Sequence, residues 1–503
     1  MLQELTNPGE RAMAQVALSR GKAQLDYLQA RYQAFLTVLL DPALVADVLA
    51  FYRLMAAWLT SLATGVSGPS GAAVLSLPLP EPAPQAFTCM PEYFVEDMCS
   101  VLLFVSRFAP QLLSSAADGA GVRLDEFAVF FTTLMASPQY IRSAFLRSKL
   151  SEVLELWLPQ NEGDELTGRS AFRRIRGPSG PAAELAALFN CHPLVVQHLT
   201  PVLVRLYNDI EHTEREGAFY FKFNMRTTIA NILRYLWAQQ HHRAVWLKAV
   251  RDEEYRGNSE RFANMLLNDL TYLLDEALKL LKLLREAEDT RADETRWAAM
   301  SREDRDELVR MQERNGQNLT AMIRSATSVI DTLNFITEEA DTTRTLLQPH
   351  MVERLRDSLN YFLKYLVGPE RRQLRVRNPE KYNFNARELL RGLVTVYLHV
   401  DSIDRAIAAN SGGGAAAPVF AAAVGGDKRS FKPEYLLEVG RGTRGPPLPL
   451  RHLSTHTAHH GLTIRMTVWF RNGIIQSPQP PLSPRHFLPR AFSCIFPLPA
   501  APL

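Results

Sequence analysis

Apolar residues recur every three or four positions along most of the first 410 residues, which is the spacing of one face of an α-helix. Residues 264–278 show the pattern most clearly. Their apolar side chains at helical spacing are Leu266, Leu267, Leu270, Leu273, Leu274 and Leu278. No alternation of apolar and polar residues typical of a β-strand precedes residue 440. The pattern therefore predicts an all-α protein.

An amphipathic helix is predicted over residues 24–40, and we expect its apolar face to enter a buried region. The residues on that face are Leu25, Leu28, Tyr32, Phe35 and Leu39. Asp41 is expected to cap the next helix, with Pro42 in its first turn, because the side chain of an N-cap aspartate accepts a hydrogen bond from a free backbone amide.

Further helices are predicted wherever the same spacing returns. They cover residues 194–209, 227–246, 319–335, 352–366 and 386–410, besides the helix that contains residues 264–278. The stretch 286–313 is highly charged, so we expect it to end one helix and to start the next through a solvated turn.

Stretches rich in proline, glycine or alanine interrupt the helical pattern and are expected to be loops: residues 64–86, 159–185 and 410–426. After Gly440 the helical pattern stops, and Pro, Arg and His become frequent. The expected division is a helical core over residues 1–440 and a disordered tail over residues 441–503. The tail lacks the apolar surface needed to offset the entropy lost when a backbone is ordered.

Many amphipathic helices joined by short loops must bury their apolar stripes on one another. Stacked antiparallel helices in an elongated α-solenoid achieve this over several hundred residues without one very large core. No repeat of fixed length is visible in the sequence. Periodicity alone also permits a compact helical bundle.

The composition places the chain among globular proteins and narrows its partners. It has 503 residues, 47% apolar and 22% charged, and its net charge of +3 gives no reason to expect nucleic acid or an anionic membrane. The cysteines are Cys89, Cys99, Cys191 and Cys494, without a Cys-x-x-Cys pair, so we expect reduced thiols. No signal peptide is visible, and we expect no apolar run long enough to span a bilayer, since Asp41, Pro42, Asp47 and Arg53 interrupt the longest candidate.

Paired carboxylates are the first candidate for chemistry. Asp269 and Glu276 are two helical turns apart, so both carboxylates could face one way and act in acid–base catalysis or hold a metal. Acids on an amphipathic helix are common, however, and we favour structural roles such as hydrogen bonds between helices. No motif for a nucleotide, a hydrolase nucleophile or a zinc protease is present. We therefore expect no catalytic, cofactor-binding or metal-binding residue and no cofactor.

Other candidates are weaker still. The histidines of residues 452–460 (His452, His456, His459 and His460) lie outside any predicted helix, which disfavours zinc binding. The basic residues 173–176 and 369–382 are candidates for phosphate binding, but the balanced charge around them favours solvated loops. The neighbours Cys191 and His192 are an improbable nucleophile and base, because adjacent residues on a helix face apart.

Ordered segments of the chain resemble one known family. They include NMLLNDLTYLLDEAL at residues 264–278 and KRSFKPEYL at residues 428–436. The others are residues 87–98, 137–154, 190–213, 219–237 and 359–390. In this order they resemble the core of the ubiquitin conjugation factor E4 family, and the resemblance extends over about residues 8–439.

The resemblance implies an armadillo-like helical array and a ligase that elongates polyubiquitin chains on substrates for proteasomal degradation. In that family the array ends in a U-box, a small module that docks a ubiquitin-conjugating enzyme and brings its thioester to the acceptor. The implied partners are that enzyme, ubiquitin and ubiquitylated substrates, ubiquitin-like domain shuttle proteins and an AAA ATPase segregase, in the cytoplasm and nucleus. Nucleic acid and membrane are not among them.

The sequence departs from the family pattern after Gly440, where we expect the tail in place of the U-box. The Asp-Pro-x-Met-x-Asp-Pro-Val pattern is not found there, and Arg451-His452-Leu453 matches only a fragment of the motif. The chain by itself is therefore expected to lack ligase activity, and a non-catalytic scaffold for ubiquitin-pathway partners is the alternative function. A third, weaker interpretation is an unrelated transport or nucleic-acid α-solenoid.

Overall fold

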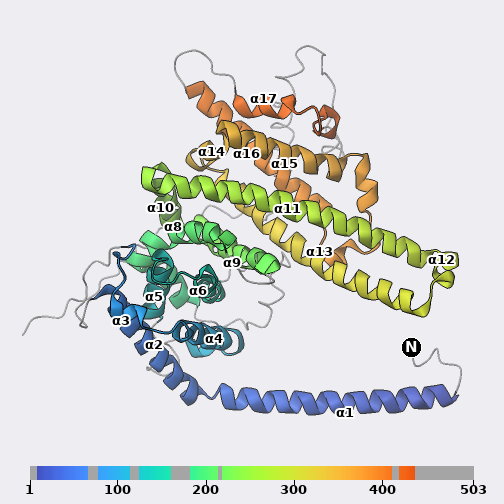
Figure 1. Cartoon of the computed structure of the whole chain (residues 1–503), viewed down its shortest axis with the longest axis horizontal. Helices are drawn as coiled ribbons and strands as arrows, with labels where there is room; N and C mark the ends of the chain where they lie inside the picture. The colour runs from blue at the N-terminus through green and yellow to red at the C-terminus, as the bar shows by residue number, and fades with distance from the viewer. Residues whose placement is uncertain are drawn as a thin grey trace, which may run out of the picture. The chain divides into compact units, whose positions relative to one another are not determined.

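A computed structural model describes residues 8–65, 77–113, 124–159, 182–212, 218–410 and 418–436. The chain separates into two units, Met1–Glu438 and Val439–Leu503, and the second lies wholly outside the described residues, as does the predicted disordered tail. Every regular element in the described part of the first unit is a helix (Figure 1). The all-α prediction is therefore confirmed.

The helices fall where the apolar spacing recurs, with a few differences set out below. The first half contains α1 (Pro8–Leu39), α2 (Pro42–Thr64), α3 (Gln85–Thr88), α4 (Tyr93–Phe108), η1 (Pro110–Leu113), α5 (Asp125–Ala136), α6 (Ala144–Leu156), α7 (Ala182–Cys191), α8 (Pro193–Asp209), η4 (Ile210–His212) and α9 (Ala218–Ala238). The second half contains α10 (Gln240–Arg251), α11 (Glu253–Ala292), α12 (Glu294–Ala299), α13 (Arg302–Ile336), α14 (Ala340–Leu346), α15 (Pro349–Val367), η5 (Pro369–Leu374), η6 (Pro379–Tyr382), α16 (Ala386–Asn410) and α17 (Val419–Gly426).

These helices stack in two rows, which can be followed from α2 to α17 in Figure 1. One row contains α2, α5, α8, α11, α15 and α17, and the other contains α4, α6, α9, α13 and α16; each helix packs against the next one in its row. The rows also pack against each other through α5 with α6, α8 with α9, α11 with α13, and α15 with α16. Stacked helix pairs of this kind form an α-solenoid, as the sequence predicted, and not a bundle around one centre.

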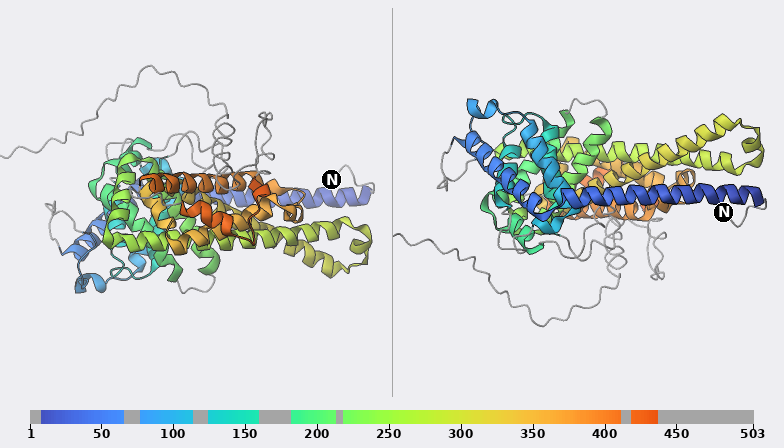
Figure 2. Two further views of the ribbon diagram at one scale, coloured as in Figure 1. Left: turned by 90° about the horizontal axis from the view of Figure 1, so that it is seen from above. Right: turned by 90° about the horizontal axis from the view of Figure 1, so that it is seen from below.

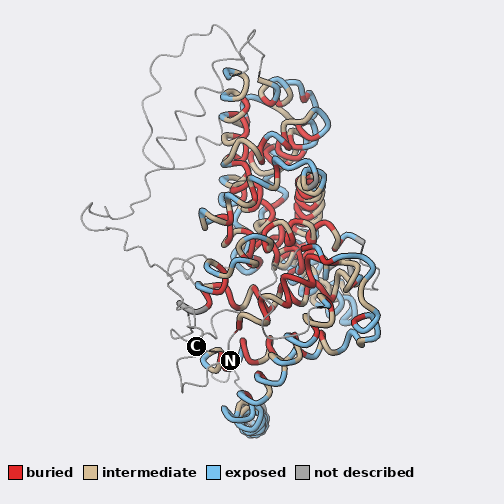
Figure 3. The backbone as a smooth tube through the Cα atoms, turned by 90° about the vertical axis from the view of Figure 1, so that its left-hand side faces the viewer, coloured by how far each residue is buried: buried red, intermediate tan, exposed pale blue. Residues whose placement is uncertain are grey.

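The core lies between the two rows and is continuous along the stack. Figure 3 shows the buried stretches in red alternating with exposed ones along the helices, as expected where one face of each helix is covered. Aromatic side chains fill the wider gaps: Trp157 packs on Phe127 and Phe131, and Trp237 packs on Trp246 and Phe335. The indole N–H of Trp157 donates to the Ser106 hydroxyl at 2.9 Å, so its polar atom is satisfied in the core.

The longest hairpin is formed by α11 and α13, which lie side by side up to the short helix α12 at its tip (Figure 2). Both turns at the tip are capped by side chains. Asp293 accepts from the backbone amides of Thr295 and Arg296, and Ser301 accepts from that of Asp304. The charged stretch 286–313 therefore ends one helix and starts another, as predicted.

The first helix differs from expectation in its surroundings. Asp41 caps α2 as predicted, accepting from the amide of Leu44 at 3.0 Å. The apolar face of α1, however, is not buried: Leu25 and Phe35 remain 54% and 56% exposed. No described element packs extensively on this helix. Apolar spacing shows that side chains share a face, but it does not supply the element that covers them.

Helix α2 differs from the expectation that no apolar run is long enough to span a bilayer. By length and composition α2 is apolar enough to cross a membrane, because Asp47 and Arg53 are its only charged residues. The expectation of no such run was therefore wrong; a second span would require α7 and α8 together, across an 82° bend. Since α2 packs on α3, α4 and α5, it behaves here as a helix of the array.

Two of the predicted loops contain residues that pack against the helical array. Residues 419–426 form α17, since Asp404 accepts from the amide of Phe420 at 2.8 Å and buries that ring against Tyr397. The predicted loop 410–426 is thus wrong over this half. Near the end of loop 64–86, Leu79 is buried and its amide donates to the Ser137 hydroxyl at 2.9 Å. The predicted helix 227–246 is two helices, because Gln239 is extended.

A pair of glycines tests the packing between α13 and α16. A Cβ at Gly392 would lie 2.5 Å from Cγ2 of Ile330, whose branched side chain has little freedom to move, so Gly392→Ala should lower stability by about 1–3 kcal/mol. At Gly257 in α11 the space is open, and Gly257→Ala should raise stability by about 0.5–1 kcal/mol. Thermal unfolding of both variants would show opposite shifts in Tm. Shifts of the same sign would contradict this packing.

Candidate functional site

The most deeply buried charge in the described part of the array is Arg226 on α9, which is 2% exposed. It occupies a position on the apolar stripe of its helix, between the buried residues Phe223 and Ala230. A guanidinium in such a place must find hydrogen-bond acceptors, because removing an unpaired charge from water costs several kcal/mol. Its partners come from α8, η4 and α11.

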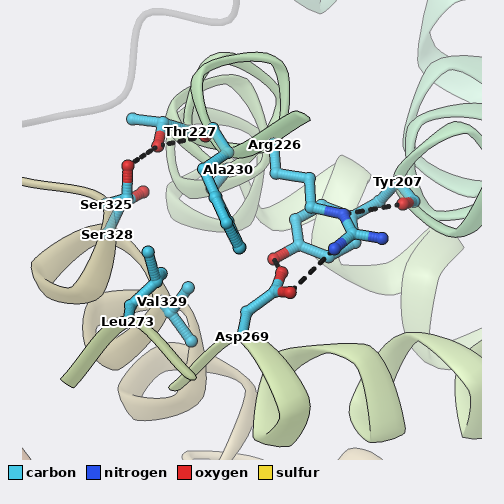
Figure 4. A pocket seen from close by; sticks show the side chains of 10 residues that line it. Tyr207, Arg226, Thr227, Ala230, Asp269, Leu273, Ser325, Ser328 and Val329 are labelled. Carbon is cyan, nitrogen blue, oxygen red and sulfur yellow. Dashed lines mark hydrogen bonds and ion pairs between the residues drawn. The ribbon is translucent and has the colours of Figure 1, made fainter. Parts of the chain in front are cut away.

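Each nitrogen of the Arg226 guanidinium has an acceptor, and Figure 4 shows those provided by Tyr207 and Asp269. One terminal nitrogen donates to Asp269 of α11 at 2.7 Å, the other donates to Glu211 at 2.9 Å, and Nε donates to the carbonyl of Tyr207 at 3.3 Å. The guanidinium also lies 5.0 Å from the centroid of the Tyr207 ring. The Tyr207 hydroxyl donates to the second oxygen of Asp269 at 2.8 Å, so both oxygens of this carboxylate are satisfied.

The charges of this cluster influence one another through a medium of low polarity. Burial raises the pKa of Asp269, while Arg226 and the Tyr207 hydroxyl act in the opposite direction. Burial and the nearby Asp269 carboxylate raise the pKa of Tyr207 well above its usual value, so this hydroxyl stays protonated and donates. At the rim, burial alone would raise the pKa of Glu211, but Arg226 and Lys222 lower it.

The space around this cluster is too small for a ligand. Residues from α8, α9, α11 and α13 line it, and Figure 4 shows Thr227 and Ser325 hydrogen-bonded across it at 3.2 Å. No position inside holds a water-sized sphere. The cluster of Arg226, Asp269, Tyr207 and Glu211, which we call the joint, therefore suits a structural role. It fixes the register of several helices and leaves no room for a substrate.

Asp269 and Glu276, the paired acids of the sequence, are not brought into one site. Asp269 makes interhelix hydrogen bonds, which is the structural role that the sequence favoured. Glu276 instead accepts from Lys279 on the surface of the same helix at 2.8 Å. Within the described ranges, no group of His, Cys, Asp and Glu side chains is arranged to hold a metal ion.

The remaining candidates are placed as follows. Cys191 is exposed at the end of α7, and His192 precedes α8; no hydrogen bond joins these two among the residues that the structure describes. The basic residues 173–176 and the histidines of residues 452–460 lie outside the described residues. The basic stretch 369–382 forms η5 and η6, between α15 and α16.

Sequence reasoning missed the residues at the centre of the joint, Arg226 and Tyr207. A signal for the first was present: Arg226 falls on an apolar stripe, and a charge in that position is rarely buried without a partner. Its anion, Asp269, lies 43 residues away, so no local pattern identifies the pair.

A third missed residue is His242, fully buried where α7, α8 and α10 meet. Its Nε2–H donates to the carbonyl of Phe189 at 2.9 Å, and its Nδ1 lies 3.5 Å from the Thr200 hydroxyl. Burial lowers the pKa of His242 to about 4, with a smaller contribution from neighbouring His241. This imidazole is therefore neutral in the folded chain.

Replacing Arg226 tests how much the joint contributes to the stability of the fold. Arg226→Met leaves Asp269 buried without its cation and should cost about 3–5 kcal/mol of stability, measured as a fall in the urea midpoint. Adding Asp269→Leu removes the stranded carboxylate, so the double variant should be more stable than Arg226→Met alone. Lys279→Met breaks two exposed ion pairs, with Asp275 and Glu276, and serves as the control with little change expected. Equal midpoints for Arg226→Met and Lys279→Met would contradict the account.

His242 should make stability depend on pH. Its folded pKa of about 4 lies below the ordinary histidine value of 6.5, so the unfolded chain binds more protons between these values. Stability should therefore fall as the pH drops below about 6.5, by up to about 1.4 kcal/mol per pH unit. His242→Gln keeps a donor for the Phe189 carbonyl and should flatten that slope in urea titrations. An unchanged slope for His242→Gln would refute the assignment.

Comparison with known proteins places this array. A family model described as the ubiquitin elongating factor core matches residues 1–444. The chain is 35% identical over 403 residues to a protein of Arabidopsis thaliana named probable ubiquitin conjugation factor E4, covering 80% of this chain and 34% of that protein. It is 28% identical over 428 residues to ubiquitin conjugation factor E4 A of Rattus norvegicus, covering 84% and 37%.

A relative in Saccharomyces cerevisiae, named E4 ubiquitin-protein ligase UFD2, is 27% identical over 357 residues, covering 69% of this chain and 32% of that protein. The chain thus spans about a third of the length of the curated relatives it matches. With a match over residues 1–444, the resemblance seen in the sequence is confirmed, and the chain belongs to the ubiquitin elongating factor core family.

Proposed function

We propose that this protein acts in polyubiquitin chain elongation, as a ubiquitin–ubiquitin ligase that extends chains on proteins destined for the proteasome. The observation that carries the proposal is the family match over residues 1–444. Relatives that are named ubiquitin conjugation factor E4, at 28–35% identity over most of this chain, support it.

In this proposal the array contributes geometry and the reacting groups are elsewhere. The buried charged side chains of the joint all form hydrogen bonds within the array; Arg226, for example, donates to Asp269 and Glu211. A ligase of this type needs no nucleophile of its own, because the conjugating enzyme carries the ubiquitin thioester and the scaffold raises the local concentration of the acceptor. Stacked helices suit that task, since each helix is braced by the next one in its row.

The proposed partners are a ubiquitin-conjugating enzyme, ubiquitin and ubiquitylated substrates, ubiquitin-like domain shuttle proteins and an AAA ATPase segregase. A U-box would be the docking site for the conjugating enzyme, and we propose that residues 441–503 do not supply one. The proposed location is the cytoplasm and the nucleus.

A second function, a non-catalytic scaffold, is favoured by one observation. The chain matches only about a third of the length of its relatives, and the matched part is the helical array. In this case residues 1–503 bind ubiquitin-pathway partners and leave ubiquitin transfer to another polypeptide or to another part of a longer one.

A reconstituted ubiquitylation assay separates the two functions. The full gene product, with activating enzyme, a panel of conjugating enzymes and a monoubiquitylated substrate, should produce longer chains, as the yeast ligase UFD2 should in the parallel control. Residues 1–503 alone should bind the ubiquitylated substrate and leave its chain length unchanged. Failure of the full gene product with every conjugating enzyme would refute the ligase proposal. Chain growth by residues 1–503 alone would refute the scaffold.

A further inference from the structure

The segment between α15 and α16 carries an unusual run of exposed cations. We call residues 371–381 the basic segment; its exposed charged groups are Arg371, Arg372, Arg375, Arg377 and Lys381. Some exposed arginines elsewhere in the array, such as Arg310 and Arg314, pair with carboxylates. None of the cations of the basic segment forms an ion pair within the part of the chain that the structure describes.

The backbone of the basic segment is anchored to the array. Leu374 and Val376 are buried, so the side chains between and beyond them, Arg375 and Arg377, point to the opposite side of this extended stretch. Two residues of α11 hold the backbone itself: the Arg285 guanidinium donates to the carbonyl of Arg372, and Glu288 accepts from the amide of Arg377 at 2.8 Å.

The end of the segment is fixed by a close approach to α13. Tyr382 is buried against Gly316, where any Cβ would lie 2.7 Å from Cε1 of the ring. Asn383 then turns the chain with a φ of 52°, a conformation that asparagine tolerates better than most residues. The cations are therefore presented from a backbone that is anchored at both ends, and rigid presentation reduces the entropy lost on binding.

A dense group of like charges on a fixed backbone repels itself and is relieved by an anionic partner. Arginine favours carboxylates and phosphates because its planar fork binds two oxygens at once. A single-stranded nucleic acid would also need exposed rings for its bases, but Tyr382, the aromatic residue next to the segment, is buried.

From these observations we propose that the basic segment binds an acidic, extended stretch of a partner protein, with carboxylates at alternate positions facing Arg375 and Arg377. This places a protein-interaction surface at the α11–α15 side of the array, where η5 packs on both helices. The surface does not depend on the ligase function, and its test involves no ubiquitin transfer.

The test is binding of a fluorescent oligoglutamate peptide to the full chain, followed by anisotropy. Replacing Arg371, Arg372, Arg375 and Arg377 with glutamine should weaken binding about tenfold or more, and added salt should weaken binding to the unaltered chain. The matched control replaces four exposed arginines of the α11–α13 hairpin with glutamine, which gives the same change in net charge. They are Arg296, Arg302, Arg310 and Arg314. The control should bind within about twofold of the unaltered chain.

Circular dichroism would show that both variants keep their helices. If the fourfold variant unfolds, Arg375→Gln with Arg377→Gln, both outward-facing residues, replaces it and should still weaken binding. Equal binding by the basic-segment and control variants would overturn the proposal. It would also be overturned if a single-stranded oligonucleotide of equal charge bound the same arginines more tightly than the peptide, since the surface would then be a nucleic-acid site.

Discussion

A buried guanidinium needs hydrogen-bond acceptors at fixed positions, so it constrains the placement of the helices that carry them. In this protein that group is Arg226 of α9. Its anions lie on α11 and η4, and its third acceptor is a carbonyl of α8, so three helices must keep one register for all the bonds to form. Apolar packing between helices is less directional, because a stripe of leucines accepts small slips. The joint therefore supplies the specificity that the leucine-rich stripes lack.

The same joint explains why the interior is unsuited to chemistry. Both oxygens of Asp269 are used, the Tyr207 hydroxyl is donated, and no water-sized space remains beside them. What the array offers instead is surface. The outward-facing cations of the basic segment between α15 and α16 and the exposed apolar face of α1 have no packing role in the described structure. In the proposed function, such surfaces position other proteins.

The sequence predicted the helices well, because amphipathic spacing is a local property. Residues 264–278 lie within α11, and Asp41 caps α2 as expected. Contacts between residues far apart in the sequence could not be predicted in the same way. Leu25 and Phe35 share a face without being covered, and α17 is stabilised by Asp404 from a different helix. The partner of Asp269 is similarly remote, so the sequence indicated a structural carboxylate without identifying Arg226.

Hydrogen–deuterium exchange across the array tests most directly whether one ion pair coordinates several helices. If the ion pair of Arg226 and Asp269 does so, Arg226→Met lowers amide protection in α8, α9 and α11 together, while α2 and α5 keep theirs. Loss of protection confined to α9, the helix that carries the substitution, would contradict the central role of this joint.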